Sequence, residues 1–154
     1  MIDQYTIRKL DPSDAQNFQH LHLKARRTDA DVFVSTLEEE QNCTLEQIKQ
    51  RLQTNYILGA FNNDKLLGTL VFMEQEKQKF KHIGILGGMY VDPDYRGRGV
   101  NRKIIGRLKQ WSISQDITEM RLDVYDNNLT AIKAYEGAGF TKHMVEMRMG
   151  LHED

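Results

Sequence analysis

Residues 90–109 read YVDPDYRGRGVNRKIIGRLK, and this stretch decides how the rest of the chain is organised. An apolar run over residues 83–91 predicts a strand, and Pro93 ends it because proline cannot donate to a strand ladder. Gly97 and Gly99 then allow a tight turn in which the backbone can approach a ligand closely. After the glycines the apolar residues recur at helical spacing and predict a helix. The apolar stripe of that helix consists of Val100, Ile104, Leu108 and Trp111.

A strand, a glycine turn and a helix N-terminus together form a candidate phosphate site. The first N–H groups of a helix have no partner within the helix, and the helix dipole adds partial positive charge there. Six basic residues and no acidic one lie between Arg96 and Lys109. The stretch therefore predicts the diphosphate seat of a nucleotide-type cofactor. It is neither a P-loop nor a dinucleotide fingerprint, because GxxxxGK[ST] and a third glycine are both absent.

Length and composition predict a single domain over residues 1–154 with a full hydrophobic core. The chain has 40% hydrophobic and 28% charged residues, as soluble globular proteins do. The net charge is −1 and the basic cluster lacks interleaved aromatics, so we expect no nucleic-acid partner. No apolar leader or 18-residue apolar run is present, which predicts a cytoplasmic protein without a membrane span. Cys43 is the only cysteine, so an internal disulfide is excluded.

The pattern along the chain predicts an α/β (α+β mixed) fold. We expect, in order, a strand at 5–10, a helix to about 27, an irregular segment at 28–43, a helix from a capping box at Thr44 to about 54, strands at 56–61, 66–72 and 83–91, a helix from Val100, a strand at 118–125, a short helix capped by Asn127 and Asn128, and a last strand or hairpin at 140–151. The order β-α-α-β-β-β-α-β-α-β(β) predicts a twisted, mixed, mostly antiparallel central sheet flanked by helices.

A second motif, NLTAIKAYEGAGF at residues 128–140, follows one helix and one strand after the first. Together with the strand ending MYVDPDYRGRG, it resembles the GNAT superfamily of acyl-CoA-dependent N-acyltransferases. The resemblance spans about residues 83–149, and the upstream order of elements agrees with the family fold. It implies acetyl-CoA (coenzyme A) as the acyl-donor co-substrate and no metal.

The resemblance also implies which residues hold the coenzyme. The family's (Gln/Arg)-x-x-Gly-x-(Gly/Ala) falls on residues 96–101, where Asn101 departs from the usual glycine or alanine. The amides from Arg98 to Lys103 would hold the diphosphate, and the strand backbone at Met89 and Val91 would pair with the pantetheine arm. The implied cofactor-binding residues are Met89, Tyr90, Val91, Arg96, Gly97, Arg98, Gly99, Val100, Asn101, Arg102, Lys103, Asn128 and Tyr135.

Tyr135 occupies the position of the family's tyrosine beside the cofactor sulfur, which implies a catalytic general acid. A phenol can give its proton to the leaving thiolate, although a tyrosine that only fills a gap between helix and sheet remains the alternative. Gly87 and Gly88 lie where many relatives carry a glutamate that acts as a base through water. The amine's proton must then go elsewhere, and the candidates are Glu74, Glu76, Asp123, Tyr125 or a water chain.

The sequence thus predicts an N-acetyltransferase in which a primary amine attacks acetyl-CoA directly in a ternary complex. The acceptor would be a small amine, an amino-acid-like metabolite or a protein amino group, and the resemblance implies a cleft built by about residues 26–45. The acidic run at residues 38–40 could attract a cationic amine there. The missing strand carboxylate motivates an alternative, a non-catalytic acyl-CoA-binding or regulatory domain. A homodimer through the C-terminal strand is a family tendency.

Overall fold

A computed structural model of the chain describes residues 4–29 and 36–152. The chain divides into two compact units, Met1–Asp123 and Val124–Asp154, and each unit is described by itself. Within the described residues no helix combines the length and the apolar character that a membrane crossing requires.

The first unit is built on a five-stranded sheet in the order β1-β2-β3-β4-β5. Its first three pairings are antiparallel and the last, between β4 and β5, is parallel, which confirms the expected mixed, mostly antiparallel sheet. The strands are β1 (Thr6–Lys9), β2 (Tyr56–Asn62), β3 (Lys65–Glu74), β4 (Ile83–Val91) and β5 (Glu119–Arg121). The helices are α1 (Ala15–Thr28), α2 (Leu37–Gln41), α3 (Leu45–Thr54) and α4 (Val100–Ser114), with short 3-10 turns at Pro12–Asp14, Gln78–Phe80 and Pro93–Tyr95.

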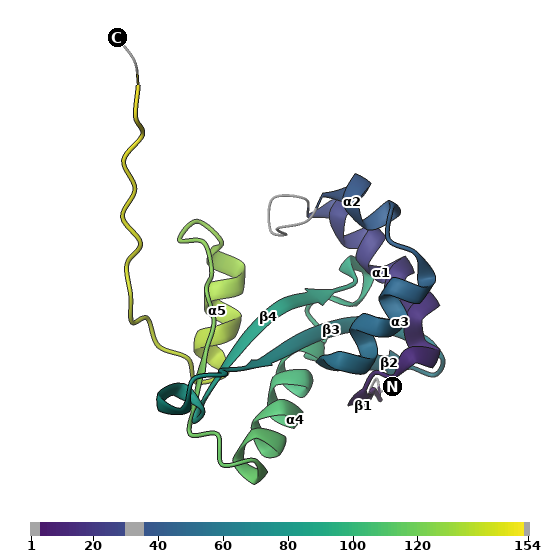
Figure 1. The fold of residues 1–154 in the computed structure, drawn as a ribbon, viewed down its shortest axis with the longest axis horizontal. Helices are drawn as coiled ribbons and strands as arrows, with labels where there is room; N and C mark the ends of the chain where they lie inside the picture. Colours follow the sequence, from purple (N-terminus) through teal and green to yellow (C-terminus); the bar gives the residue numbers. More distant parts are fainter. Residues whose placement is uncertain (1–3, 30–35, 153–154) are drawn as a thin grey trace. The chain divides into compact units, whose positions relative to one another are not determined.

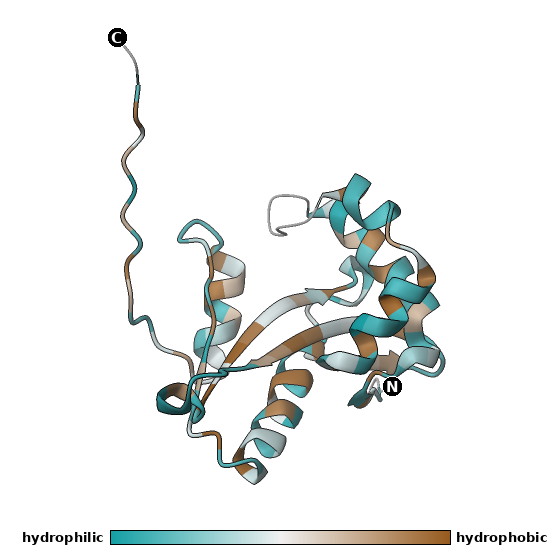
Figure 2. Cartoon of the chain, viewed as in Figure 1, coloured by the Kyte–Doolittle hydropathy of each residue, from teal (hydrophilic) through white to brown (hydrophobic). Residues whose placement is uncertain are grey.

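Helices cover both faces of this sheet, with α1 to α3 on one face and α4 on the other (Figure 1). Apolar positions run along the strands and alternate with polar ones on the helices, as amphipathic helices require (Figure 2). The core under α1 and α3 includes Leu10, Phe18, Leu21, Ile48, Leu52, Ile57 and Phe61. On the opposite face α4 buries Val100, Ile104 and Leu108. Trp111 of the same stripe stacks on Tyr56 with ring centroids 3.9 Å apart.

The helix signals in the sequence are confirmed where side chains cap the backbone. The Thr44 hydroxyl accepts from the Gln47 amide at 3.1 Å, and the Gln47 side chain accepts from the Thr44 amide at 2.9 Å. This reciprocal capping box opens α3. Ahead of α1, the Asp11 carboxylate accepts from the Ser13 amide at 2.8 Å. The capping box therefore fixes the start of α3, whereas Asp11 caps the 3-10 turn Pro12–Asp14 that leads into α1.

Three expectations about extent are wrong. Part of the segment expected to be irregular forms α2, which is too short to show an apolar period and starts where Thr36 accepts from the Glu39 amide. The strand expected over residues 118–125 ends at Arg121. The final strand expected over residues 140–151 is not formed, since residues 140–152 carry neither helix nor strand. Alternating apolar residues predict a strand, but only a hydrogen-bonded neighbour makes one. Those residues are Val145, Met147, Met149 and Leu151.

The second unit contains α5 (Leu129–Gly137), with both ends as the sequence predicts. Asn128 caps the start, its side-chain oxygen accepting from the Ala131 amide at 3.3 Å. At the other end Gly139 has a positive φ of 108°. The Phe140 amide donates to the Tyr135 carbonyl and the Gly139 amide to the Glu136 carbonyl, both at 3.0 Å. This pair of bonds is the glycine-terminated C-cap expected from the sequence.

Candidate active site

The edge of β4 is open along the half that leads into α4. β5 pairs only with residues 83–85 of β4, so from Leu86 to Val91 that edge has no strand neighbour among residues 4–29 and 36–152. A bulge lies in the same half, where Gly88 has a φ of +58° and the register against β3 shifts. An open edge presents N–H and C=O groups that another extended molecule can pair with. The Asp92 amide donates to the Leu67 carbonyl of β3. Successive residues of a strand direct their backbone N–H and C=O groups to opposite sides, so the N–H and C=O of Val91 face the open edge.

The turn after β4 leaves helix amides without a side-chain cap. Gly97 and Gly99 adopt left-handed backbone angles, with φ of 77° and 79°. These backbone angles favour glycine at both positions. A Cβ at either glycine would meet nothing within 4 Å, so the space beside the turn is open. Gly99 is the N-cap of α4 and brings no side chain to its amides. The first amide bonded within the helix is that of Lys103, which donates to the Gly99 carbonyl at 3.1 Å. The preceding amides suit an anion.

The side chains of the turn already make contacts within the first unit. The Arg98 guanidinium lies 5.2 Å from the Tyr95 ring and the Lys103 amine 5.0 Å from the Tyr5 ring. Asn101 is helical, so its departure from glycine introduces no unusual backbone angle. Its side-chain oxygen is nevertheless buried without a hydrogen-bond partner. The departure from glycine or alanine therefore leaves one buried acceptor without a hydrogen bond.

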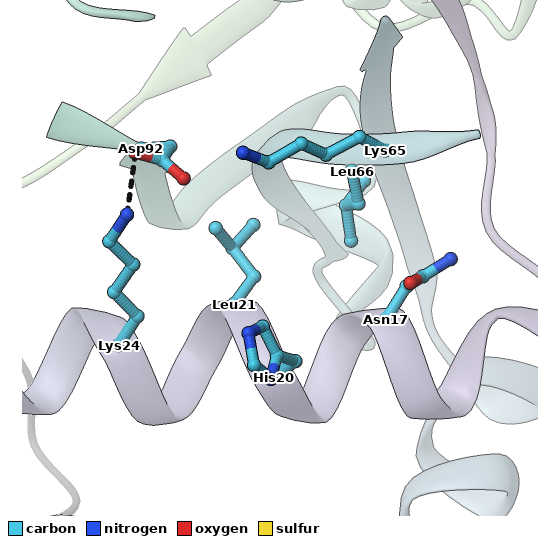
Figure 3. Close-up of a pocket in the computed structure, with 7 residues that line it drawn as sticks. All are labelled: Asn17, His20, Leu21, Lys24, Lys65, Leu66 and Asp92. Carbon is cyan, nitrogen blue, oxygen red and sulfur yellow. Dashed lines mark hydrogen bonds and ion pairs between the residues drawn. The ribbon is translucent and has the colours of Figure 1, made fainter. Parts of the chain in front are cut away.

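The C-terminal half of α1 contacts the junction between β4 and α4, and Figure 3 shows one of these contacts. The Lys24 amine pairs with the Asp92 carboxylate at 2.9 Å beside a pocket of about 100 Å³. Burial alone would raise the pKa of Asp92, but the Lys24 bond and the Asp94 amide hold that pKa below its usual value. The pocket is lined by Asn17, His20, Leu21, Lys24, Lys65, Leu66 and Asp92. Sequence reasoning missed this junction because its contacts join residues far apart in the chain.

A buried polar network ties α1 to β3 on the sheet face below α2. His22 lies between Thr69, whose hydroxyl is 3.0 Å from Nε2, and Arg26, whose guanidinium is 2.8 Å from Nδ1. A guanidinium can only donate, so Nδ1 accepts and the proton sits on Nε2. Burial, reinforced by the positive charges of Arg26 and Arg51, lowers the pKa of His22 to about 3. The imidazole is therefore neutral at physiological pH.

The acidic run of the sequence is divided between this network and the surface. Glu40 is buried and pairs with Arg26 at 3.4 Å and with Arg51 at 3.7 Å. Glu38 and Glu39 are exposed. The charge of Glu40 is therefore neutralised by its ion pairs with Arg26 and Arg51. Only Glu38 and Glu39 are exposed and available to attract a cationic amine, as the sequence predicted for the whole run. Residues 30–35 of the expected acceptor segment lie outside the described residues.

Tyr135 and Asn128 belong to the second unit and are described within it. The Tyr135 ring packs edge-on against Phe140, with centroids 6.0 Å apart. Burial raises the pKa of Tyr135 above the usual value for a phenol. The hydroxyl is therefore fully protonated at neutral pH, as a proton donor must be. The Asn128 side chain caps α5, while its expected contact with a coenzyme stays a prediction.

The four candidate bases occupy exposed positions. Glu74 ends β3 opposite Gly84, at the end of β4 that pairs with β5. Glu76 lies between β3 and the next turn, Asp123 follows β5, and Tyr125 is 56% exposed in the second unit. None is singled out by its surroundings, so the identity of the base stays open. No group of three or more metal-ligating side chains occurs among the residues that the structure describes.

Comparison with known proteins places this arrangement in a family. The sequence model of the Acetyltransferase (GNAT) family matches residues 16–140. Streptothricin acetyltransferase of Escherichia coli is 28% identical over 83 residues, 54% of this chain and 45% of that protein. An aminoglycoside N(6')-acetyltransferase type 1 of Stenotrophomonas maltophilia is 31% identical over 71 residues, 45% of this chain and 46% of that protein. The chain belongs to the GNAT acetyltransferase family, although it spans less than half the length of these relatives.

Solved structures support the same fold. A GNAT-family acetyltransferase from Streptococcus pneumoniae superimposes with a TM-score of 0.79 at 21% identity, covering 92% of this chain and 87% of that one. PaiA N-acetyltransferase from Thermoplasma acidophilum, solved in complex with coenzyme A, gives a TM-score of 0.75 at 18% identity, with 93% of each chain covered. At these identities the likeness shows the fold.

Proposed function

We propose that this protein is an acetyl-CoA-dependent N-acetyltransferase that transfers the acetyl group to a primary amine. The observation that carries the proposal is the uncapped N-terminus of α4 directly after the open edge of β4. Helix amides of this kind bind phosphate oxygens, and a free strand edge pairs with an extended arm that carries amides. Coenzyme A has a diphosphate and an amide-containing pantetheine arm in sequence, so it matches the two features together.

The proposed binding mode assigns a role to the chain's own groups. The amides from Arg98 to Arg102 hold the diphosphate, since the Lys103 amide already donates to the Gly99 carbonyl. The basic side chains of the turn add favourable charge. The backbone of Met89 and Val91 pairs with the pantetheine arm along the open edge. Asn128 and Tyr135 belong to the second unit, and the family resemblance alone supports their proposed roles: contact with the coenzyme for Asn128 and proton donation for Tyr135.

The proposed reaction is a direct transfer within a ternary complex. The amine nitrogen attacks the thioester carbonyl, the new C–N bond forms, and the C–S bond breaks. The leaving thiolate takes its proton from the Tyr135 hydroxyl, and a base or water takes the proton that the amine loses. Because burial raises the pKa of Tyr135, proton donation to a thiolate is uphill, and a transfer concerted with C–S cleavage lowers that cost.

The acceptor we favour is the amine of a small molecule. Relatives named for acetylation of streptothricin, of the ε nitrogen of thialysine and of the 6' nitrogen of aminoglycosides support this choice. A peptide amine is the second possibility for the same chemistry. The absence of a carboxylate at Gly87 and Gly88 favours a different function, a non-catalytic acyl-CoA-binding domain. The two functions differ in whether any amine accelerates thiol release.

An acetyl-CoA turnover assay over a panel of amines tests the proposal. We expect at least one primary amine to accelerate thiol release, and Tyr135→Phe to lower kcat about 100-fold, within the range of general acid catalysis. Cys43→Ala is the control, and it should leave turnover unchanged because direct attack needs no protein nucleophile. Slow hydrolysis that no amine accelerates would instead support the binding domain. Unchanged kcat in Tyr135→Phe would remove the tyrosine from the mechanism, and loss of activity in Cys43→Ala would indicate an acyl-enzyme.

A further inference from the structure

The end of α1 contacts the junction between β4 and α4 at three points. The Lys24 amine bonds Asp92 at 2.9 Å. The Thr28 hydroxyl lies 3.0 Å from the Tyr90 hydroxyl. Beyond the helix, the Asp29 carboxylate pairs with the Arg96 guanidinium. Three successive contacts of this kind join the layer of helices on one sheet face to the turn that carries the uncapped amides.

Arg96 is held on two sides by groups of the protein itself. Its Nε donates to the Val91 carbonyl at 3.0 Å, and its terminal nitrogen binds Asp29. The guanidinium carbon also lies 5.5 Å from the centre of the Tyr90 ring. A guanidinium is a rigid planar fork, so bonds from two of its nitrogens to different elements fix its plane. These contacts direct Arg96 toward α1 and the end of β4.

We propose that Arg96 is a positioning residue and that Asp29 is its anchor. Resting on the proposed function, the inference is that this pair holds the turn so that its amides converge on the coenzyme diphosphate. Arg96 then acts through the backbone of the turn and through Val91, one of whose carbonyl lone pairs it occupies. Asp29 lies outside both sequence motifs, so its part in coenzyme binding comes from the fold alone.

A different role for Arg96, direct contact between its guanidinium and the diphosphate, makes the opposite prediction for Asp29. In that arrangement the carboxylate competes with phosphate for the same cation, and its removal strengthens coenzyme binding. In the positioning arrangement its removal weakens binding, because the turn loses its anchor. The two roles are therefore separated by the sign of one effect.

Calorimetric titration of the full chain with coenzyme A tests the inference. We expect Asp29→Asn and Arg96→Gln each to raise Kd about fivefold, or about 1 kcal/mol at 1.4 kcal/mol per decade. The double variant should be no weaker than Arg96→Gln alone, because both changes break the same link. Turnover should show the loss in KM for acetyl-CoA, with kcat at saturation nearly unchanged. Glu46→Gln, which breaks an exposed ion pair on α3, is the control and should bind like the parent protein.

Each outcome of this experiment has a distinct meaning. Unchanged or tighter binding in Asp29→Asn overturns the positioning role, as does a double variant whose loss is the sum of the two single losses. A parent protein that does not bind coenzyme A contradicts the proposed function. Thr28→Val, which removes only the hydroxyl contact with Tyr90, provides a milder variant if Asp29→Asn unfolds. We expect it to raise Kd about twofold, and unchanged binding in Thr28→Val would then overturn the positioning of the turn from the end of α1.

Discussion

Two polar regions of the molecule differ in how their hydrogen-bonding groups are satisfied. They are the buried network around His22 and the turn before α4. In the network, each side chain from Thr69 through Arg26 to Glu40 contacts another side chain of the protein. In the turn, Gly99 provides no side chain to the amides at the start of α4. One region satisfies its polar groups internally and stabilises the fold, whereas the other leaves amides to a ligand. Charge alone therefore does not mark the site, because arginines serve both regions.

The largest expected effect separates the two regions by stability. Glu40→Gln leaves the buried Arg26 without its carboxylate partner, and we expect the free energy of unfolding to fall by about 3 kcal/mol. Coenzyme affinity of the folded protein should be unchanged, because Glu40 pairs with Arg26 and Arg51 and not with a residue of the turn. Glu38→Gln, on the exposed side of the same helix, is the matched control and should change stability by less than about 0.5 kcal/mol. Equal effects of the two substitutions in urea denaturation would show that the buried pairs contribute nothing.

The second expected effect is a pH dependence that belongs to the network. The folded pKa of His22, about 3, lies below the unfolded value of 6.5, so the unfolded chain binds the proton more tightly between these values. The contribution of His22 to stability is therefore present above pH 6.5 and is lost as the pH falls. We expect the free energy of unfolding to decrease by about 2 kcal/mol between pH 7 and pH 5. His22→Gln can keep both hydrogen bonds without titrating, so its stability should be nearly flat over this range. Denaturation midpoints at both pH values provide the measurement, and parallel losses in the parent and the variant would contradict the assignment.

The smallest effect compares two glycines of the site and its helix. Gly99→Ala places a side chain on left-handed backbone, which we expect to lower the free energy of unfolding by about 1 kcal/mol. Gly106→Ala, in the interior of α4 where a Cβ meets nothing, should raise it by up to about 1 kcal/mol. Thermal unfolding of the two variants gives the signs directly. Stabilisation by Gly99→Ala would show that the turn does not require glycine.

The sequence predicted most of the fold and the outline of the site for local reasons. The Thr44 capping box, the apolar segments that form β2 to β4 and the Asn128 and Gly139 ends of α5 depend on neighbouring residues, and the structure confirms them. Contacts between distant residues leave no local pattern, so the sequence alone could not predict the Asp29–Arg96 ion pair. The last strand or hairpin was predicted wrongly, because strand pairing depends on a neighbour that the residues of the segment do not specify.

The central claim is that the turn before α4 seats a phosphate of the coenzyme, and one competition measurement tests it most directly. Pantetheine and 4′-phosphopantetheine differ by a single phosphate, and each can compete with coenzyme A for the full chain in a calorimetric displacement titration. Charged hydrogen bonds contribute about 1.5–3 kcal/mol each, so we predict that the phosphorylated form binds at least about tenfold more tightly. Equal affinity of the two compounds would contradict a phosphate seat at the start of α4.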